Sequence, residues 1–137
     1  MTGISLLPKT YQYEKSLILL VIKSSSAGYH LAKKMAKDNF EVLSTEDYAQ
    51  AQSFYLNDSP NLVLISIKKP EKDTFTFCAS LRKLTDGWTT PIILLTAAVN
   101  AVTLEQAFAA GLSAILPETI NWKVLRQRVQ QYIQRSE

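Results

Sequence analysis

The sequence predicts a single α/β domain, a doubly wound three-layer fold in which helices cover both faces of a five-stranded, mostly parallel sheet. Three observations support this fold class. Short continuous apolar runs lie between turn residues, as expected for strands that are buried on both faces. A segment with helical periodicity follows each run, and the alternation occurs five times within 137 residues, the usual length of one domain. Hydrophobic residues make up 47% of the chain, which is enough for a packed core.

The predicted elements follow an N-terminal extension of residues 1–15. The predicted strands are residues 17–22, 40–44, 62–67, 91–96 and 114–116. The predicted helices are residues 27–37, 48–56, 75–84 and 103–110, and a last helix that follows Asn121. Capping residues mark the helix starts: Ser24–Ser26, Thr45–Asp47, Asp73 or Thr74, and Asn121. Gly111 is expected to close the fourth helix.

The central segment is Asn61–Pro70, with the sequence NLVLISIKKP. Its apolar run contains one polar residue, Ser66, near the carboxyl end of the strand. In open α/β sheets, ligands bind beyond the carboxyl ends of the strands. Ser66 is therefore the first candidate for a functional position.

Composition limits the classes of function. The net charge of +3 is too small to indicate nucleic-acid binding. The single cysteine, Cys78, excludes an internal disulfide and is expected to be a buried, inert thiol in a reducing compartment. The apolar runs have strand length, so we expect a soluble cytoplasmic domain without a membrane segment. His30 has no ligand partners at metal-binding spacing, and we expect no metal and no cofactor.

Several segments together resemble the receiver domain of bacterial response regulators, the CheY-like domain, over residues 16–135. The segments are PNLVLISIKKP, ASLRKL, PIILLTA and AFAAGLSAIL. The resemblance implies the strand order 2-1-3-4-5. It also implies phosphoryl transfer to an aspartate, with Mg²⁺ held by an acidic pair and the phosphoryl oxygens held by a lysine and a Ser or Thr.

Carried over position by position, the resemblance implies that most of this machinery is replaced. Ser66 stands at the phosphoacceptor position, and Ile22 and Lys23 stand at the acidic pair. Thr96 lies thirty residues after Ser66, as the family's Ser or Thr does, and Glu118 lies twenty-two residues later at the lysine position. The residue at the family's switch aromatic is Ile115. We expect a pseudo-receiver that keeps the fold and has no phosphorylation or other enzymatic activity.

Two side-chain questions stay open at this point. Lys23 and Glu118 either form an ion pair that fills the pocket or point separately into solvent. Thr96 either satisfies a backbone group at the end of its strand or keeps a switching role.

The remaining expectation concerns surfaces. In the family, the fourth helix, fifth strand and fifth helix form the dimer and output face. Here we expect that face to use Leu104, Phe108, Ile115, Trp122 and Arg126, either in a homodimer or with a protein partner. The segment INWKVLRQRVQQYIQR resembles the ending of receivers that precede diguanylate cyclase or cyclic-di-GMP phosphodiesterase domains, which implies control of such an attached output domain.

Two alternatives remain. In the first, the altered pocket senses a small molecule or an anion, which Lys23, Lys68 and Lys69 would favour. In the second, the domain is phosphorylated at an unconventional residue.

Overall fold

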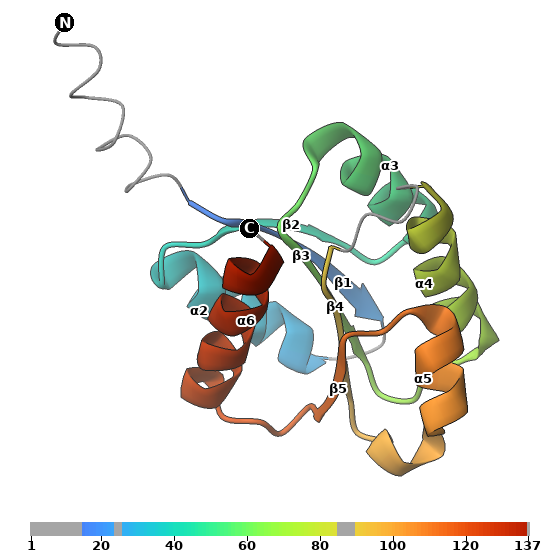
Figure 1. Ribbon diagram of the computed structural model, residues 1–137. Coiled ribbons are helices and arrows are strands. Elements are labelled where there is room, and N and C mark those ends of the chain that lie inside the picture. The colour runs from blue at the N-terminus through green and yellow to red at the C-terminus, as the bar shows by residue number, and fades with distance from the viewer. Residues whose placement is uncertain (1–14, 24–25, 85–89, 137) are drawn as a thin grey trace, which may run out of the picture.

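The structure is a computed structural model that describes residues 15–23, 26–84 and 90–136 (Figure 1). Most of the predicted N-terminal extension, the caps Ser24 and Ser25 and the predicted turn at Asp86–Gly87 lie outside the described residues.

A five-stranded parallel sheet forms the centre of the domain, in the order β2-β1-β3-β4-β5. The strands are β1 (Leu17–Lys23), β2 (Glu41–Thr45), β3 (Leu62–Ile67), β4 (Ile92–Thr96) and β5 (Ala114–Pro117). The predicted fold class and strand order are therefore confirmed, with strand ends that differ from the predicted ones by at most one residue.

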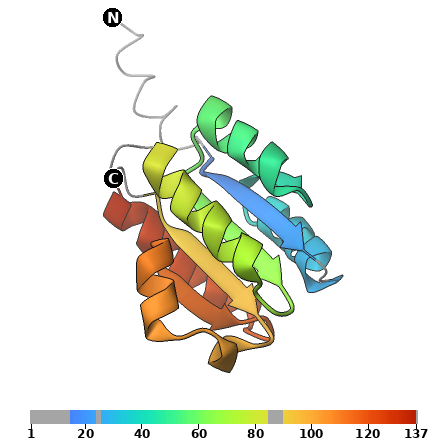
Figure 2. The ribbon, with the colours of Figure 1, turned by 90° about the vertical axis from the view of Figure 1, so that its right-hand side faces the viewer.

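Helices cover both faces of the sheet (Figures 1 and 2). The helices are α2 (Ser26–Lys37), α3 (Tyr48–Asp58), α4 (Lys72–Leu84), α5 (Leu104–Ala110) and α6 (Trp122–Ser136). Helices α2 and α6 lie on one face, and α3, α4 and α5 lie on the other. Every residue of β3 is buried, because the strand lies in the middle of the sheet between the two helical layers.

Side chains alternate between two apolar clusters, one under each helical layer. Ile22 and Leu64 belong to the cluster that packs against α2 and α6, whereas Val21 and Ile67 belong to the cluster on the α3, α4 and α5 face. Neighbouring strands are in register, with Ile22 opposite Ser66 and Lys23 opposite Ile67. Ser66 and Lys23 therefore point to opposite faces of the sheet, because successive residues of a strand alternate between its faces.

Most of the predicted helix ends are confirmed. Asp47 caps α3, and Asn121 accepts a hydrogen bond from the amide of Lys123 at the start of α6. Thr103 and Gln106 form a capping box at α5, and Gly111 closes this helix with φ of 80°.

Two features of the helices were not predicted. Helix α4 begins at Lys72, before the expected caps, because the Thr74 hydroxyl accepts a hydrogen bond from the amide of Glu71 at 3.1 Å from within the first turn. A 3₁₀ turn, η1, spans Val99–Ala101.

Arg82 connects α4 to two other segments. Its Nε and Nη2 donate to the Gly111 carbonyl at 3.1 and 2.6 Å, and its Nη1 donates to the Thr90 carbonyl at 2.6 Å. One side chain thus joins α4 to the turn after α5 and to the segment before β4.

The expected burial of Cys78 is confirmed. The side chain is fully buried on α4, and burial raises the pKa of the thiol to about 12. In the described part of the chain, no helix has the length and apolar character needed to cross a membrane.

Candidate functional site

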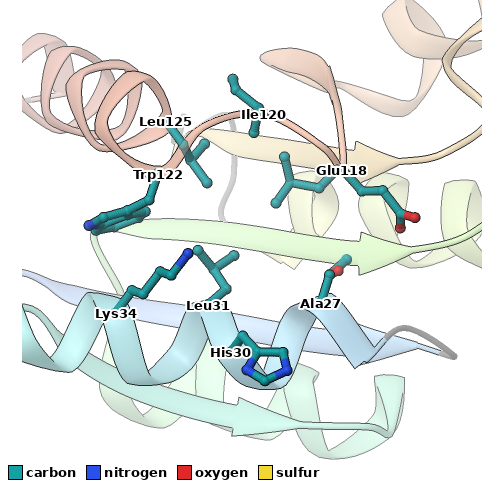
Figure 3. A pocket seen from close by; sticks show the side chains of 10 residues that line it. Ala27, His30, Leu31, Lys34, Glu118, Ile120, Trp122 and Leu125 are labelled. Atoms are coloured by element: carbon teal, nitrogen blue, oxygen red, sulfur yellow. The ribbon is translucent and has the colours of Figure 1, made fainter.

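A cavity of about 260 Å³ lies between α2 and α6 at the carboxyl end of β3 (Figure 3). Its polar lining comes from four side chains: Ser66 on β3, Glu118 after β5, and His30 and Lys34 on α2. The remaining lining residues are all apolar apart from the indole N–H of Trp122, so the cavity has apolar walls and few polar groups. This is the usual character of small-molecule sites.

The sequence positions this cavity through two strands and a close helix approach. Ser66 is 1% exposed and faces α2 and α6, together with its register partner Ile22. Helix α2 approaches β1 closely at Gly28, where an added Cβ would lie 2.8 Å from Cγ2 of Ile22. Ala27, Leu31 and Lys34 then face the cavity at helical spacing.

Glu118 is held in the turn between β5 and α6. Its backbone amide donates to the Thr96 carbonyl at 3.1 Å, which anchors the turn to the end of β4. The side-chain Oε2 is buried and has no hydrogen-bond partner. The site thus contains a carboxylate oxygen with unused capacity to accept hydrogen bonds.

Of the two interpretations of Lys23 and Glu118, the ion pair is wrong, since the two side chains form no salt bridge among the described residues. Lys23 lies on the other face of the sheet, where Nζ donates to the Glu46 carbonyl at 2.9 Å and sits 4.7 Å from the ring centroid of Tyr48. The other interpretation, a lysine that points freely into solvent, does not describe Lys23 fully either. Lys23 is only partly exposed, and its ammonium group contacts both the Glu46 carbonyl and the Tyr48 ring. Strand alternation explains the result, because Lys23 follows Ile22, which shares the face of Ser66.

The ring of Tyr48 is itself fixed within the α3 and α4 layer. It stacks on Phe77 with centroids 4.7 Å apart, and its hydroxyl donates to Oγ1 of Thr74 at 3.0 Å. Burial raises the pKa of Tyr48, so this ring is a neutral, ordered partner for the Lys23 ammonium.

Thr96 fills the structural role that was one of its two interpretations. Its side chain is fully buried, and its hydroxyl donates to the Lys68 carbonyl at 2.8 Å and accepts from the amide of Ala98 at 3.1 Å. Thr96 is not among the residues that line the cavity. The structure therefore brings Ser66, Ile22 and Glu118 to one face and places Lys23 and Thr96 elsewhere.

The residues present do not fit a magnesium site of the family's type. Mg²⁺ requires octahedral oxygen ligands and is usually bound through one or two carboxylates together with water. Of the described residues, Glu118 alone contributes a carboxylate to the cavity lining, and Ile22 places an apolar side chain on the same face as Ser66. No group of three or more metal-ligating side chains occurs among the described residues.

The predicted interaction face divides into two parts. Leu104 and Phe108 are each 87% exposed and lie one turn apart on α5, while Ile115 is partly buried against the core. Trp122 and Arg126 instead lie on α6 and contact Asp38, the residue that follows α2. Both bind the Asp38 carboxylate, Trp122 through its indole N–H and Arg126 through Nη1 at 3.4 Å.

Sequence reasoning did not place Lys34 and Trp122 in the cavity. The signal was present for α2, because residues 27, 31 and 34 recur at helical spacing on the side that faces the sheet. For Trp122 the sequence offered no comparable signal, since its contact with Asp38 joins residues 84 positions apart.

Comparison with known proteins connects this geometry to a family. The family model described as "Response regulator receiver domain" matches residues 18–130. The chain is 29% identical to the transcriptional regulatory protein RstA of Escherichia coli K12 over 88% of its length, and 30% identical to the response regulator PleD of Caulobacter vibrioides over 81%. It spans 49% of RstA and 25% of PleD.

A solved structure shows the same architecture. The receiver domain of sensor histidine kinase PA1611 from Pseudomonas aeruginosa superimposes with a TM-score of 0.76 at 21% identity, covering 88% of this chain and 99% of that chain. That structure has a magnesium ion in its active-site cleft. The fold, the matched residues and the sheet order together show that this chain belongs to the response regulator receiver domain family.

Proposed function

We propose that this receiver domain is a non-enzymatic regulatory module that acts through protein contacts and is not phosphorylated in the manner of its family. The cavity lining supports the absence of phosphorylation. A serine hydroxyl is a weak nucleophile unless a base or a metal activates it. Among the described residues, no acidic cluster lies beside Ser66, and the one carboxylate of the lining belongs to Glu118, at the position of the family's lysine.

A phosphorylation assay tests this part of the proposal. The protein is incubated with acetyl phosphate and Mg²⁺, and its intact mass is measured. We expect no added phosphate, whereas a stable mass increase that maps to any residue of the chain would favour the alternative of phosphorylation at an unconventional site.

The observation that carries the proposed interaction is the exposure of Leu104 and Phe108. Both large apolar side chains are 87% exposed on α5, which is fixed at one end by its capping box and at the other by Gly111. Side chains one turn apart on a helix form a continuous patch. Burial of one such side chain contributes roughly 1.5–3 kcal/mol, so a contact that covered both would favour association strongly.

We propose a homodimer through this patch and the adjacent β5 and α6. Sedimentation of the unmodified protein over a range of concentrations should show a monomer–dimer equilibrium. Leu104→Asp should weaken the dimer by about tenfold or more, because a charge in an apolar contact loses the burial energy and adds a desolvation cost. Leu56→Asp is the matched control, since Leu56 is also exposed, at 54%, but lies on α3.

Two results would contradict the dimer. One is a monomer at every concentration. The other is an equal effect of Leu56→Asp and Leu104→Asp, because the contact would then not be specific to α5.

We further propose that the module controls an attached output domain in cyclic-di-GMP signalling. The support is the sequence of α6 and the similarity to the response regulator PleD, of which this chain spans 25%. In cells that carry the gene, chromosomal Leu104→Asp should change the cyclic-di-GMP level and Leu56→Asp should not. An unchanged level with Leu104→Asp would exclude this output, and a change in transcription instead would favour an output like that of the transcriptional regulator RstA.

A further inference from the structure

We infer that the cavity between α2 and α6 binds a small organic monoamine, with its ammonium group at Glu118 and Ser66 and its apolar body between the two helices. The inference rests on the proposed function only in taking Ser66 as unphosphorylated. It does not depend on the α5 contact.

Glu118 has a buried carboxylate oxygen that no hydrogen bond satisfies. Among buried side-chain atoms of the described residues, only Glu118 Oε2 and Tyr55 Oη lack a hydrogen-bond partner. A buried polar atom without a partner is unfavourable, and an ionised carboxylate can only accept hydrogen bonds. The group that completes this site must therefore donate hydrogen bonds, and a positive charge would strengthen them.

The nearby lysines, Lys23 and Lys34, do not donate to this oxygen. Lys23 is bound on the other face of the sheet. Lys34 lines the same cavity, but it makes no ion pair with Glu118. Figure 3 shows Lys34 beside Trp122 toward one end of the cavity and Glu118 at the other. The acceptor at Glu118 is thus left open to a molecule from solution.

The cavity has the size and lining of a site for a small amphipathic molecule. Its volume of about 260 Å³ is at the small end of the range for ligand sites, which suits a molecule of about one ring. Leu31, Leu95, Ile120 and Leu125 provide apolar walls between the two polar ends. An amphipathic molecule with its ammonium head at the Glu118 end and its apolar body against these walls matches this arrangement.

The charges at the two ends define the ligand further. Lys34 and the His30 ring lie away from Glu118, so a second ammonium group would meet a cation and a monoamine is favoured over a polyamine. An anionic group at the Glu118 end is disfavoured because it would bring negative charge to Glu118. Lys23, Lys68 and Lys69, the lysines expected to favour an anion, are absent from the cavity lining.

The test uses the ¹⁵N-labelled full chain and benzylamine as the probe, followed by two-dimensional NMR. We expect saturable shifts at the amides of Ala27, Leu31 and Ser66, with a Kd in the millimolar range that is typical of a fragment-sized ligand. Benzyl alcohol and benzoate have the same ring without the positive charge. Benzyl alcohol and benzoate should both bind more weakly than benzylamine, because neither brings a positive charge to Glu118.

Variants identify the group that is responsible. Glu118→Gln should raise the Kd for benzylamine by about tenfold or more, because it removes a charged hydrogen-bond acceptor. Glu41→Gln is the matched control, since it removes the same charge at an exposed position on β2. Ala27→Leu keeps Glu118 but adds a side chain at the cavity lining, and it should also weaken binding.

Each contrary result overturns the inference. One such result is that benzoate or benzyl alcohol binds as tightly as benzylamine. The others are an unchanged Kd for benzylamine in Glu118→Gln and the absence of saturable shifts at the cavity amides. The dispersion of each variant's spectrum shows whether it is folded. Failure here would leave the acetyl phosphate result and the Leu104→Asp result unaffected, so the two proposals can fail separately.

Discussion

The role of Thr96 can be measured by replacing its hydroxyl with a methyl group. Thr96→Val keeps the shape of this fully buried side chain but removes the hydrogen bond donated to the Lys68 carbonyl and the one accepted from the Ala98 amide. The Lys68 carbonyl keeps its bond from the Ala97 amide at 3.1 Å, which limits the loss there. At about 1 kcal/mol for each lost bond, we expect unfolding free energy to fall by about 2 kcal/mol.

Urea and thermal denaturation provide the assay. For a chain of this length, 2 kcal/mol corresponds to a decrease in Tm of about 6 °C. Thr76→Val is the matched control, because Thr76 is exposed and its hydroxyl donates only within α4, to the Lys72 carbonyl. That change should cost less than about 0.5 kcal/mol.

A third variant separates hydrogen bonding from packing. Thr96→Ser keeps the hydroxyl and removes one buried methyl group, so it should cost about 1 kcal/mol, less than Thr96→Val. The reasoning is refuted if Thr96→Val is no more destabilising than Thr76→Val, or if Thr96→Ser is the more destabilising change at position 96.

Three further predictions concern stability. Burial raises the pKa of Cys78 from 9.0 to about 12, so its thiol ionises first in the unfolded chain. The contribution of the buried thiol to the free energy of unfolding is therefore complete below pH 9, and it falls by about 1.4 kcal/mol per pH unit between pH 9 and pH 12. Urea denaturation at pH 8 and pH 10 should show this loss relative to Cys78→Ala, and an equal slope in both proteins would refute it. Gly28→Ala should destabilise by about 1 kcal/mol or more in thermal unfolding, despite the better helix propensity of alanine, because its Cβ would lie 2.8 Å from Ile22; a stabilised variant would contradict this contact. Asp38→Ala should cost about 1–2 kcal/mol in urea and change Trp122 fluorescence, while Asp58→Ala at the exposed end of α3 should do neither.

The strands of the sheet were predictable because each one is encoded by a short stretch of consecutive residues. Each strand is a short apolar run between turn residues, and the run at Leu62–Ile67 is buried at every position. Helix caps were predictable where a side chain bonds to an amide just after it, as at Asp47 and Asn121. The start of α4 was missed because Thr74 bonds backward to Glu71, so the polar residue that looks like a cap lies inside the helix.

The candidate site was only partly predictable. The resemblance indicated where each residue lies along its strand, but not to which face of the sheet its side chain points. The resemblance placed Lys23 and Glu118 near the carboxyl ends of the strands, and both residues lie there in the structure. Strand alternation, which was available from the sequence, would have assigned Lys23 to the opposite face from Ser66. The unsatisfied oxygen of Glu118 could not be predicted, since it depends on how α2 and α6 pack together.

The contact between Arg82 and Gly111 makes these two positions energetically interdependent. Gly111 has φ of 80°, and a Cβ there would lie 2.7 Å from Nε of Arg82. Any larger residue at position 111 would therefore strain its own backbone and also displace the guanidinium that binds its carbonyl. A double substitution should cost less than the sum of the two single ones, because the first change already removes part of what the second would remove. Positions 82 and 111 are thus expected to tolerate change together more readily than apart.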